Sequence, residues 1–289
     1  MNIDLVLQLA LQGFLMGGVY GLIALGLSLI FGVMRVINFA HGEMMVFAMF
    51  LTITFLLSLG LDPYLSLPIT AAIMFGIGYG VQRIFVNRIL DMPEAMQVLV
   101  LVGIGIIFEN CTLMIWGGSD ISPKTSLALS SFRLGALTVD VPRLIAFVLA
   151  ILITLMVILF LKKTSIGKTI RAAADNRFGA LIVGAHINRV YGFCFGIGAA
   201  CVGAAGTLLV PLMPAKATMG APYTLISFVI VILGGMGSLF GALVGGLIIG
   251  VAESLGTVFL PSSMKQVVSF TIMIIILLFR PQGLFGGKG

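Results

Sequence analysis

The chain has 289 residues, of which 60% are hydrophobic and only 9% are charged. A soluble globular domain carries about 25% charged residues, so this composition excludes a water-soluble fold and indicates a chain that resides in a lipid bilayer. The formal net charge of +6 comes from basic residues between apolar runs and not from a basic patch with aromatics, so it does not indicate nucleic-acid binding.

Apolar runs that are long enough to cross a bilayer follow one another along the whole chain. The stretch Ala217–Ala252 has no charge and is too long for one span, and Gly234, Gly235 and Gly237 divide it, so that its first part is a half-helix candidate. The sequence therefore predicts an all-α, polytopic transmembrane bundle of eight or nine spans in one domain, residues 1–289. The predicted spans are Leu5–Met34, Ile37–Leu61, Tyr64–Gln82, Ala95–Trp116, Leu144–Leu161, Val190–Met213, Tyr223–Leu233, Ser238–Gly256 and Val267–Phe279.

The distribution of Lys and Arg predicts how the chain is oriented, because these residues concentrate on the cytoplasmic side of membrane proteins. The loop formed by residues 162–189 carries six of them and a single acid, Asp175, so we expect it in the cytoplasm. Counting spans from this loop places the N-terminus outside and the C-terminus inside, which requires an odd number of spans. The count also places Arg35, Arg83, Arg88, Arg280 and Lys288 inside, and Lys124, Arg133, Arg143, Lys216 and Lys265 outside.

Glycines recur at intervals of four residues, a spacing that lets helix backbones approach closely in lipid. We expect close packing of helices within the chain, with a specific face for a partner subunit as the alternative. Gly-rich spans beside a polar interruption occur in both the first and the last third, as in transporters built from internal repeats. The spaced glycines are Gly13, Gly17 and Gly21; Gly76 and Gly80; Gly241 and Gly245; and Gly246 and Gly250.

The sequence carries no motif that predicts catalysis, a metal site or a cofactor. The triplet Gly167-Lys168-Thr169 looks like the end of a P-loop, but Lys162 stands where the phosphate loop needs its first glycine. The histidines do not form a zinc motif, and no nucleophile elbow occurs. The three cysteines fall inside apolar runs, so we interpret them as small buried hydrophobic residues. They are Cys111, Cys194 and Cys201.

Polar side chains inside the apolar runs are candidates for a translocation path, because such groups are costly in lipid and usually face a cavity or a partner. The densest group follows the first span and is either the wetted end of a span or part of the path. Two glutamates lie within later spans, where an interhelical hydrogen bond is the alternative to a role in the path. The candidates are Asn38, His41, Gly42, Glu43, Glu109 and Glu253.

The loop of residues 162–189 has an ordered pattern of its own. Ile170–Asp175 is rich in helix formers, Asp175 or Asn176 can cap a second short helix, and Gly184 would end it. This pattern predicts two short amphipathic helices at the membrane surface. An ordinary basic loop would satisfy the charge distribution, but the length and order of the segment favour docking to a cytoplasmic partner.

Several motifs together closely resemble the permeases of ABC transporters for branched-chain amino acids. The resemblance begins with Gly18–Gly32 (GVYGLIALGLSLIFG) and continues with Ile37–Gly42 (INFAHG). Gly167–Gly184 looks like the coupling segment of that family, and the family pattern also matches Gly234–Ser238 (GGMGS) and Arg280–Phe285 (RPQGLF). The resemblance spans nearly the whole chain and is strongest to the shorter of the two permeases that pair in such systems.

The resemblance implies a subunit that makes no covalent chemistry and binds no cofactor, in a bacterial inner membrane. It implies a second related permease, two cytoplasmic ATPases and a periplasmic binding protein as partners, with leucine, isoleucine and valine as substrates. Relatives of the family also carry urea, short amides or other amino acids. The residues that would couple this chain to an ATPase are Gly167, Arg171, Ala172, Asp175, Asn176, Ala180 and Gly184.

Three other functions compete with this one. A carrier driven by an ion gradient could use Glu109 and Glu253, but it leaves the ordered loop unexplained. A passive channel would need neither ATP nor a binding protein. An intramembrane enzyme lacks any recognisable constellation of nucleophile and base or of metal ligands.

Overall fold

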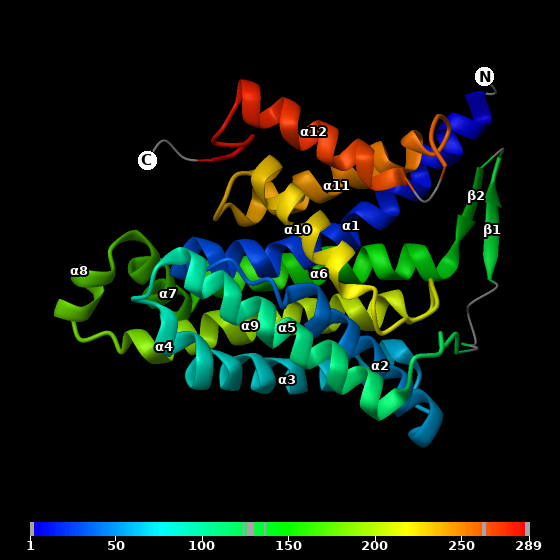
Figure 1. The fold of residues 1–289 in the computed structure, drawn as a ribbon. Helices are drawn as coiled ribbons and strands as arrows, with labels where there is room; N and C mark the ends of the chain where they lie inside the picture. The colour runs from blue at the N-terminus through cyan, green and yellow to red at the C-terminus, as the bar shows by residue number, and fades with distance from the viewer. Residues whose placement is uncertain (1–2, 124, 126–129, 136, 262–263, 287–289) are drawn as a thin grey trace.

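The computed structural model describes residues 3–123, 125, 130–135, 137–261 and 264–286 (Figure 1). In these ranges, 7 helices are long and apolar enough to cross a membrane, and two shorter apolar helices accompany them. The predicted polytopic all-α bundle is therefore confirmed. The helices are α1 Ile3–Met34, α2 His41–Leu59, α3 Pro63–Val81, α5 Glu94–Trp116, α6 Val141–Lys163, α9 Ile187–Leu209 and α11 Leu239–Gly256, with the shorter α10 Gly220–Gly234 and α12 Lys265–Phe279.

The bundle has two distinct ends. A two-stranded antiparallel sheet, β1 Ser131–Leu134 and β2 Leu137–Asp140, lies at the end where α1 begins, and the short helices α7 Ser165–Asp175 and α8 Arg177–Ile182 lie at the other (Figure 1). We call these the hairpin end and the α8 end. The side chain of Gln8 holds β2 to α1 through two hydrogen bonds with the backbone of Thr138, of 2.7 and 2.8 Å.

The hairpin was not predicted, because its strands are short and lie between two long apolar runs. Basic residues that the charge pattern assigns to the cytoplasm gather at the α8 end, where Arg35, Lys162 and Arg171 line one cavity and Arg83 and Arg189 line another. Lys288, which the charge pattern assigns to the cytoplasm, and Lys124, which it assigns to the opposite side, are not among the described residues.

The second span begins later than the predicted Ile37. Residues 35–40 are not helical, and Arg35 has a positive φ of 55°. The Asn38 side chain accepts a hydrogen bond from the backbone N–H of Ala40 at 3.1 Å, a local turn that competes with helix. His41 Nε2 then donates to the carbonyl of Ile23 at 2.9 Å, so α2 starts beside the middle of α1. At 1.5 Å per residue, Ile23 lies about 16 Å from the end of α1 at Met34.

The third span continues past the predicted end at Gln82. A π-helical turn, η1 Gln82–Val86, and the short α4 Asn87–Ile89 extend α3, so the apolar span reaches Ile89. Arg83 and Arg88 do not end the helix, because long basic side chains extend to the membrane surface while their stems stay in apolar surroundings.

The most extensive helix contact in the bundle is between α1 and α11, and glycines line it. A Cβ added at Gly17 would lie 2.7 Å from the carbonyl oxygen of Gly246, and one added at Gly246 would collide with the backbone of Gly21. The predicted close packing is confirmed here. It is wrong for Gly76 and Gly80, where an added Cβ would meet nothing within 4 Å in the described part of the chain.

The packing partners of the first and last thirds correspond. Helices α1, α2 and α3 correspond in turn to α9, α10 and α11. α1 packs against α11, and α9 packs against α3. In the same way, α2 contacts α3 and α9, and α10 contacts α11 and α1. The two groups run in opposite directions, since α1 starts at the hairpin end and α9 starts at the α8 end (Figure 1). α1 and α9 are the most buried spans and form the centre of the bundle. The glycine-rich internal pattern of the sequence thus coincides with an inverted arrangement of helices.

Candidate translocation path and coupling segment

The N-termini of α2 and α10 meet inside the bundle. The backbone N–H of Gly42 donates to Thr224 Oγ1 at 2.8 Å, and the Glu43 carboxyl group lies against Gly220. A helix N-terminus carries a positive partial charge, so two of them together stabilise a buried carboxylate. We call the residues at this meeting point the helix junction: Asn38, His41, Gly42, Glu43, Gly220 and Thr224.

Three side chains of the helix junction have unused hydrogen-bonding capacity. Asn38 and His41 are fully buried and Glu43 is only 6% exposed. Asn38 Nδ2, His41 Nδ1 and Glu43 Oε2 have no hydrogen-bond partner within the described chain. Buried polar atoms without partners are costly, so the helix junction is suited to bind water or a polar solute.

A second carboxylate approaches the helix junction from α5. A Cβ added at Gly105 would lie 3.4 Å from Cα of Ala40 and 3.6 Å from Cγ of Glu43, so α5 covers the junction. Glu109 follows one helical turn later and interacts electrostatically with Glu43. Glu109 is half-buried and Asn110 is exposed, although the exposed side chains of α5 after Glu94 are otherwise apolar. Because such side chains are costly in lipid, this face of α5 suits a water-filled path or a second protein.

Glu253 has partners of its own. Its two carboxyl oxygens accept hydrogen bonds from Tyr20 Oη at 3.2 Å and from Ser269 Oγ at 2.5 Å. These hydrogen bonds join α11 to α1 and α12. They match the alternative given from the sequence, in which a buried glutamate bonds between helices and does not line the path. The structure thus brings Glu109 to Glu43 but gives Glu253 a separate set of bonds.

The two short helices at the α8 end begin and end with recognisable caps. Thr164 Oγ1 accepts from the N–H of Gly167 at 3.0 Å at the start of α7, five residues before the expected Ile170. Of the two residues considered as the second cap, Asn176 fills the position, since its side chain accepts from the N–H of Gly179 at 2.8 Å.

Gly184 closes the segment with a φ of 86°, a conformation that favours glycine. Its N–H bonds the carbonyl of Leu181, and the N–H of Ala185 bonds that of Ala180, both at 3.0 Å. This is the Schellman pattern of a helix C-terminus, and the predicted short helices are present.

The residues expected to couple this segment to an ATPase divide into two groups. Gly167 and Ala180 are buried and hold the segment against the bundle, and a Cβ at Gly167 would lie 2.6 Å from the carbonyl oxygen of Phe160. The guanidinium of Arg171 donates to the carbonyl of Lys162 at 3.2 Å, at the last turn of α6. The group on the surface comprises Arg171, Ala172, Asp175, Asn176 and Gly184.

The sequence interpretation missed an apolar surface on α8 and the turn that follows it. Phe178 and Ile182 are each 72% exposed and Val183 is 81% exposed. Several large apolar side chains exposed together outside the membrane spans form a candidate protein interaction site. The signal was present in the sequence, since these residues stand in the most polar segment of the chain.

Comparisons with known proteins point to one family. The family described as "Branched-chain amino acid transport system / permease component" matches residues 9–277. The high-affinity branched-chain amino acid transport system permease proteins BraD of Pseudomonas aeruginosa and LivH of Escherichia coli (strain K12) are each 29% identical over 97% of this chain and 95% of their own length.

A probable branched-chain amino acid transport permease protein LivH of Methanocaldococcus jannaschii is 32% identical over 92% of this chain and 88% of its own. No solved structure matches significantly. The motifs of the sequence, the helical bundle and these relatives agree, and the chain belongs to the family of branched-chain amino acid transport system permease components.

Proposed function

We propose that this chain is a membrane-spanning subunit of an ATP-driven importer that carries leucine, isoleucine and valine across a bacterial inner membrane. The names of its relatives support this substrate class. The proposal includes a second related permease that covers the α5 face, two ATPases that bind the α8 end from the cytoplasm, and a periplasmic binding protein at the hairpin end. The chain itself makes and breaks no covalent bond.

The observation that carries the substrate class is the carboxyl group of Glu43, buried at the helix junction. A branched-chain amino acid has a cationic ammonium group and an aliphatic side chain. Glu43 Oε2 has no hydrogen-bond partner among the residues that the structure describes and suits the ammonium group, and Glu109 is a second acidic residue close to it. Phe39 and Phe228, whose ring centroids lie 5.1 Å apart, offer apolar surface beside it. Urea and short amides have no charge to place against these carboxylates.

A continuous chain of contacts connects the coupling segment to the helix junction. α7 packs against α6, α1 and α9, and α9 packs against α2, which carries Glu43. Closure of the ATPases on ATP would move α7 and α8, and through α9 it would shift α2 relative to α10. The junction would then open to one side of the membrane at a time, as expected when ATP binding biases a two-state transporter.

The substrate proposal is tested by uptake of labelled leucine into cells that lack this gene and carry either the intact gene or a variant. Glu43→Gln should reduce leucine uptake about tenfold or more, since a hydrogen bond to a charged group contributes about 1.5–3 kcal/mol. Glu94→Gln is the matched control, because Glu94 is exposed at the start of α5. If urea uptake depends on the gene and leucine uptake does not, the substrate class is wrong.

The coupling proposal is tested separately with two matched phenylalanines. Phe178 is 72% exposed on α8 and Phe259 is 77% exposed in the turn after α11, at the hairpin end. Phe178→Asp should abolish co-purification of the ATPases and leucine uptake, while Phe259→Asp should leave co-purification intact. If Phe178→Asp transports normally and binds the ATPases, α8 does not couple, and a carrier driven by an ion gradient becomes the better explanation.

A further inference from the structure

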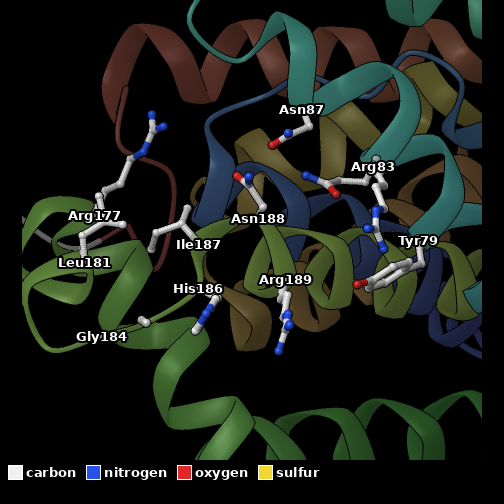
Figure 2. Close-up of a pocket in the computed structure, with 12 residues that line it drawn as sticks. Tyr79, Arg83, Asn87, Arg177, Leu181, Gly184, His186, Ile187, Asn188 and Arg189 are labelled. Carbon is white, nitrogen blue, oxygen red and sulfur yellow. The ribbon is translucent and has the colours of Figure 1, made fainter.

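A groove of about 820 Å³ opens at the α8 end of the bundle (Figure 2). One wall is the extended end of α3, with Tyr79, Arg83 and Asn87, and the other is the connection from α8 into α9, with His186 and Arg189. The groove therefore separates the coupling segment from the third span, and anything bound in it would contact both.

The groove is strongly basic. Arg83, Arg177 and Arg189 line it, and none of the described residues that line it is acidic. Arg177 forms an ion pair with Asp91 at 3.2 Å, but Arg83 and Arg189 have no acidic partner in the described ranges of the chain. Two unpaired guanidinium groups on opposite walls create a local positive potential, which favours an anion.

A buried donor adds a specific contact. Gln82 lines the groove, is 1% exposed, and its Nε2 has no hydrogen-bond partner within the described residues. Gln82 begins the π-helical turn η1, and such turns inside helices are frequent at functional sites. An amide N–H together with two guanidinium groups gives the set of donors that recognises a phosphate group.

The position of the groove favours a phosphate that belongs to a lipid. Arg83 lies six residues, or about 9 Å, before the end of the third span at Ile89, which places it near the depth of the headgroups. Ile84 and Phe85, next to Arg83, are 50% and 42% exposed and offer apolar surface for acyl chains. We propose that the groove binds the phosphate headgroup of an anionic lipid through Arg83, Arg189 and Gln82. The bound headgroup would link the third span to the coupling segment.

The test uses the purified full-length chain in nanodiscs of phosphatidylcholine that contain phosphatidylglycerol, with the bound anionic lipid measured by native mass spectrometry. Arg83→Gln and Arg189→Gln should each weaken phosphatidylglycerol binding about fivefold, the effect of one basic residue near a charged membrane surface. Gln82→Leu should also weaken binding without a change of charge. Arg88→Gln is the matched control, because Arg88 is exposed on α4 but does not line the groove. Thermal unfolding establishes that each variant is folded.

Four results would overturn the proposal. Equal losses for Arg83→Gln and Arg88→Gln would mean that general surface charge attracts the lipid. Unchanged phosphatidylglycerol binding by Gln82→Leu would show that Gln82 does not contact the headgroup. The chain could bind inorganic phosphate through the same residues in nanodiscs of phosphatidylcholine alone, and retain no phosphatidylglycerol in the mixed nanodiscs. These two results together would assign the groove to a free phosphate. If the arginine variants keep the lipid but lose the co-purified ATPases, the groove binds an acidic protein segment.

Discussion

The backbone N–H of Gly42 donates a hydrogen bond of 2.8 Å to Thr224 Oγ1, and this contact joins the N-termini of α2 and α10 within the bundle. The first N–H groups of a helix have no partner inside that helix, so each N-terminus must find one elsewhere. Here a side chain of α10 accepts the hydrogen bond from a backbone N–H at the start of α2. A carboxylate, Glu43, lies at the same point, where the positive ends of both helices converge.

Replacing Thr224 by valine should separate this contact from packing, because the two side chains have similar shape. The variant leaves the N–H of Gly42 buried without its partner, which costs about 1–3 kcal/mol. We expect a lower temperature of thermal unfolding in detergent and slower leucine uptake. Thr271→Val is the control, since Thr271 is exposed and its hydroxyl group donates to the carbonyl of Val267 within α12. Equal unfolding temperatures for the two variants would show that the contact does not hold the helix junction together.

The glycines of α1 and α11 give a second pair of matched variants. Gly246→Val places side-chain atoms against the backbone of Gly21 and should force the two helices apart. We expect this to lower the free energy of unfolding by about 1–3 kcal/mol or more. Gly76→Val adds the same atoms where no atom of the described residues lies within 4 Å, so it should change the free energy of unfolding by about 0.5 kcal/mol or less. The yield of monodisperse protein after extraction measures the difference. Similar yields for both would mean that α1 and α11 do not need their close approach.

These contacts show which parts of the fold the sequence predicts and which it does not. Long apolar runs without charge define most of the spans, because a bilayer forces their backbone into helices. The caps at Asn176 and Gly184 are local, so their effect is visible in the sequence. The start of α2 at His41 depends on a local turn at Asn38, which is not visible within an apolar run. The continuation of the third span past Gln82 depends on where the basic side chains reach the membrane surface.

The candidate site shows the same division. Polar residues inside apolar runs identified Glu43, Glu109 and Glu253 as unusual. Their pairing could not be predicted, because Glu43 and Glu109 meet only when α5 packs over the N-terminus of α2. The role of Thr224 was missed for the same reason: a threonine in an apolar helix gives no signal until its partner, 182 positions away, is known.

Glu253 provides a test of whether a buried acid serves the path or the architecture. Glu253→Leu would leave the hydroxyl groups of Tyr20 and Ser269 without their acceptor, and each loss costs about 1–3 kcal/mol. We expect a strongly lowered unfolding temperature, with leucine uptake per folded molecule close to that of the intact chain. Combining Glu253→Leu with Tyr20→Phe and Ser269→Ala should recover part of the stability, because no polar group is then left unpaired. Full stability with no uptake would instead place Glu253 in the path.

Asn176 allows the coupling segment to be loosened while the exposed apolar side chains of α8 stay unchanged. Its side chain caps α8 through the N–H of Gly179, and loss of such a cap costs about 1 kcal/mol. Asn176→Ala should therefore raise amide hydrogen exchange in α8 about fivefold and leave exchange in α9 unchanged. Asn176→Asp keeps the capping oxygen and should restore slow exchange. If α8 must be ordered when an ATPase docks, ATP-dependent leucine uptake will fall in Asn176→Ala and recover in Asn176→Asp. A fall of equal size in both variants would show that the amide group itself contacts the partner.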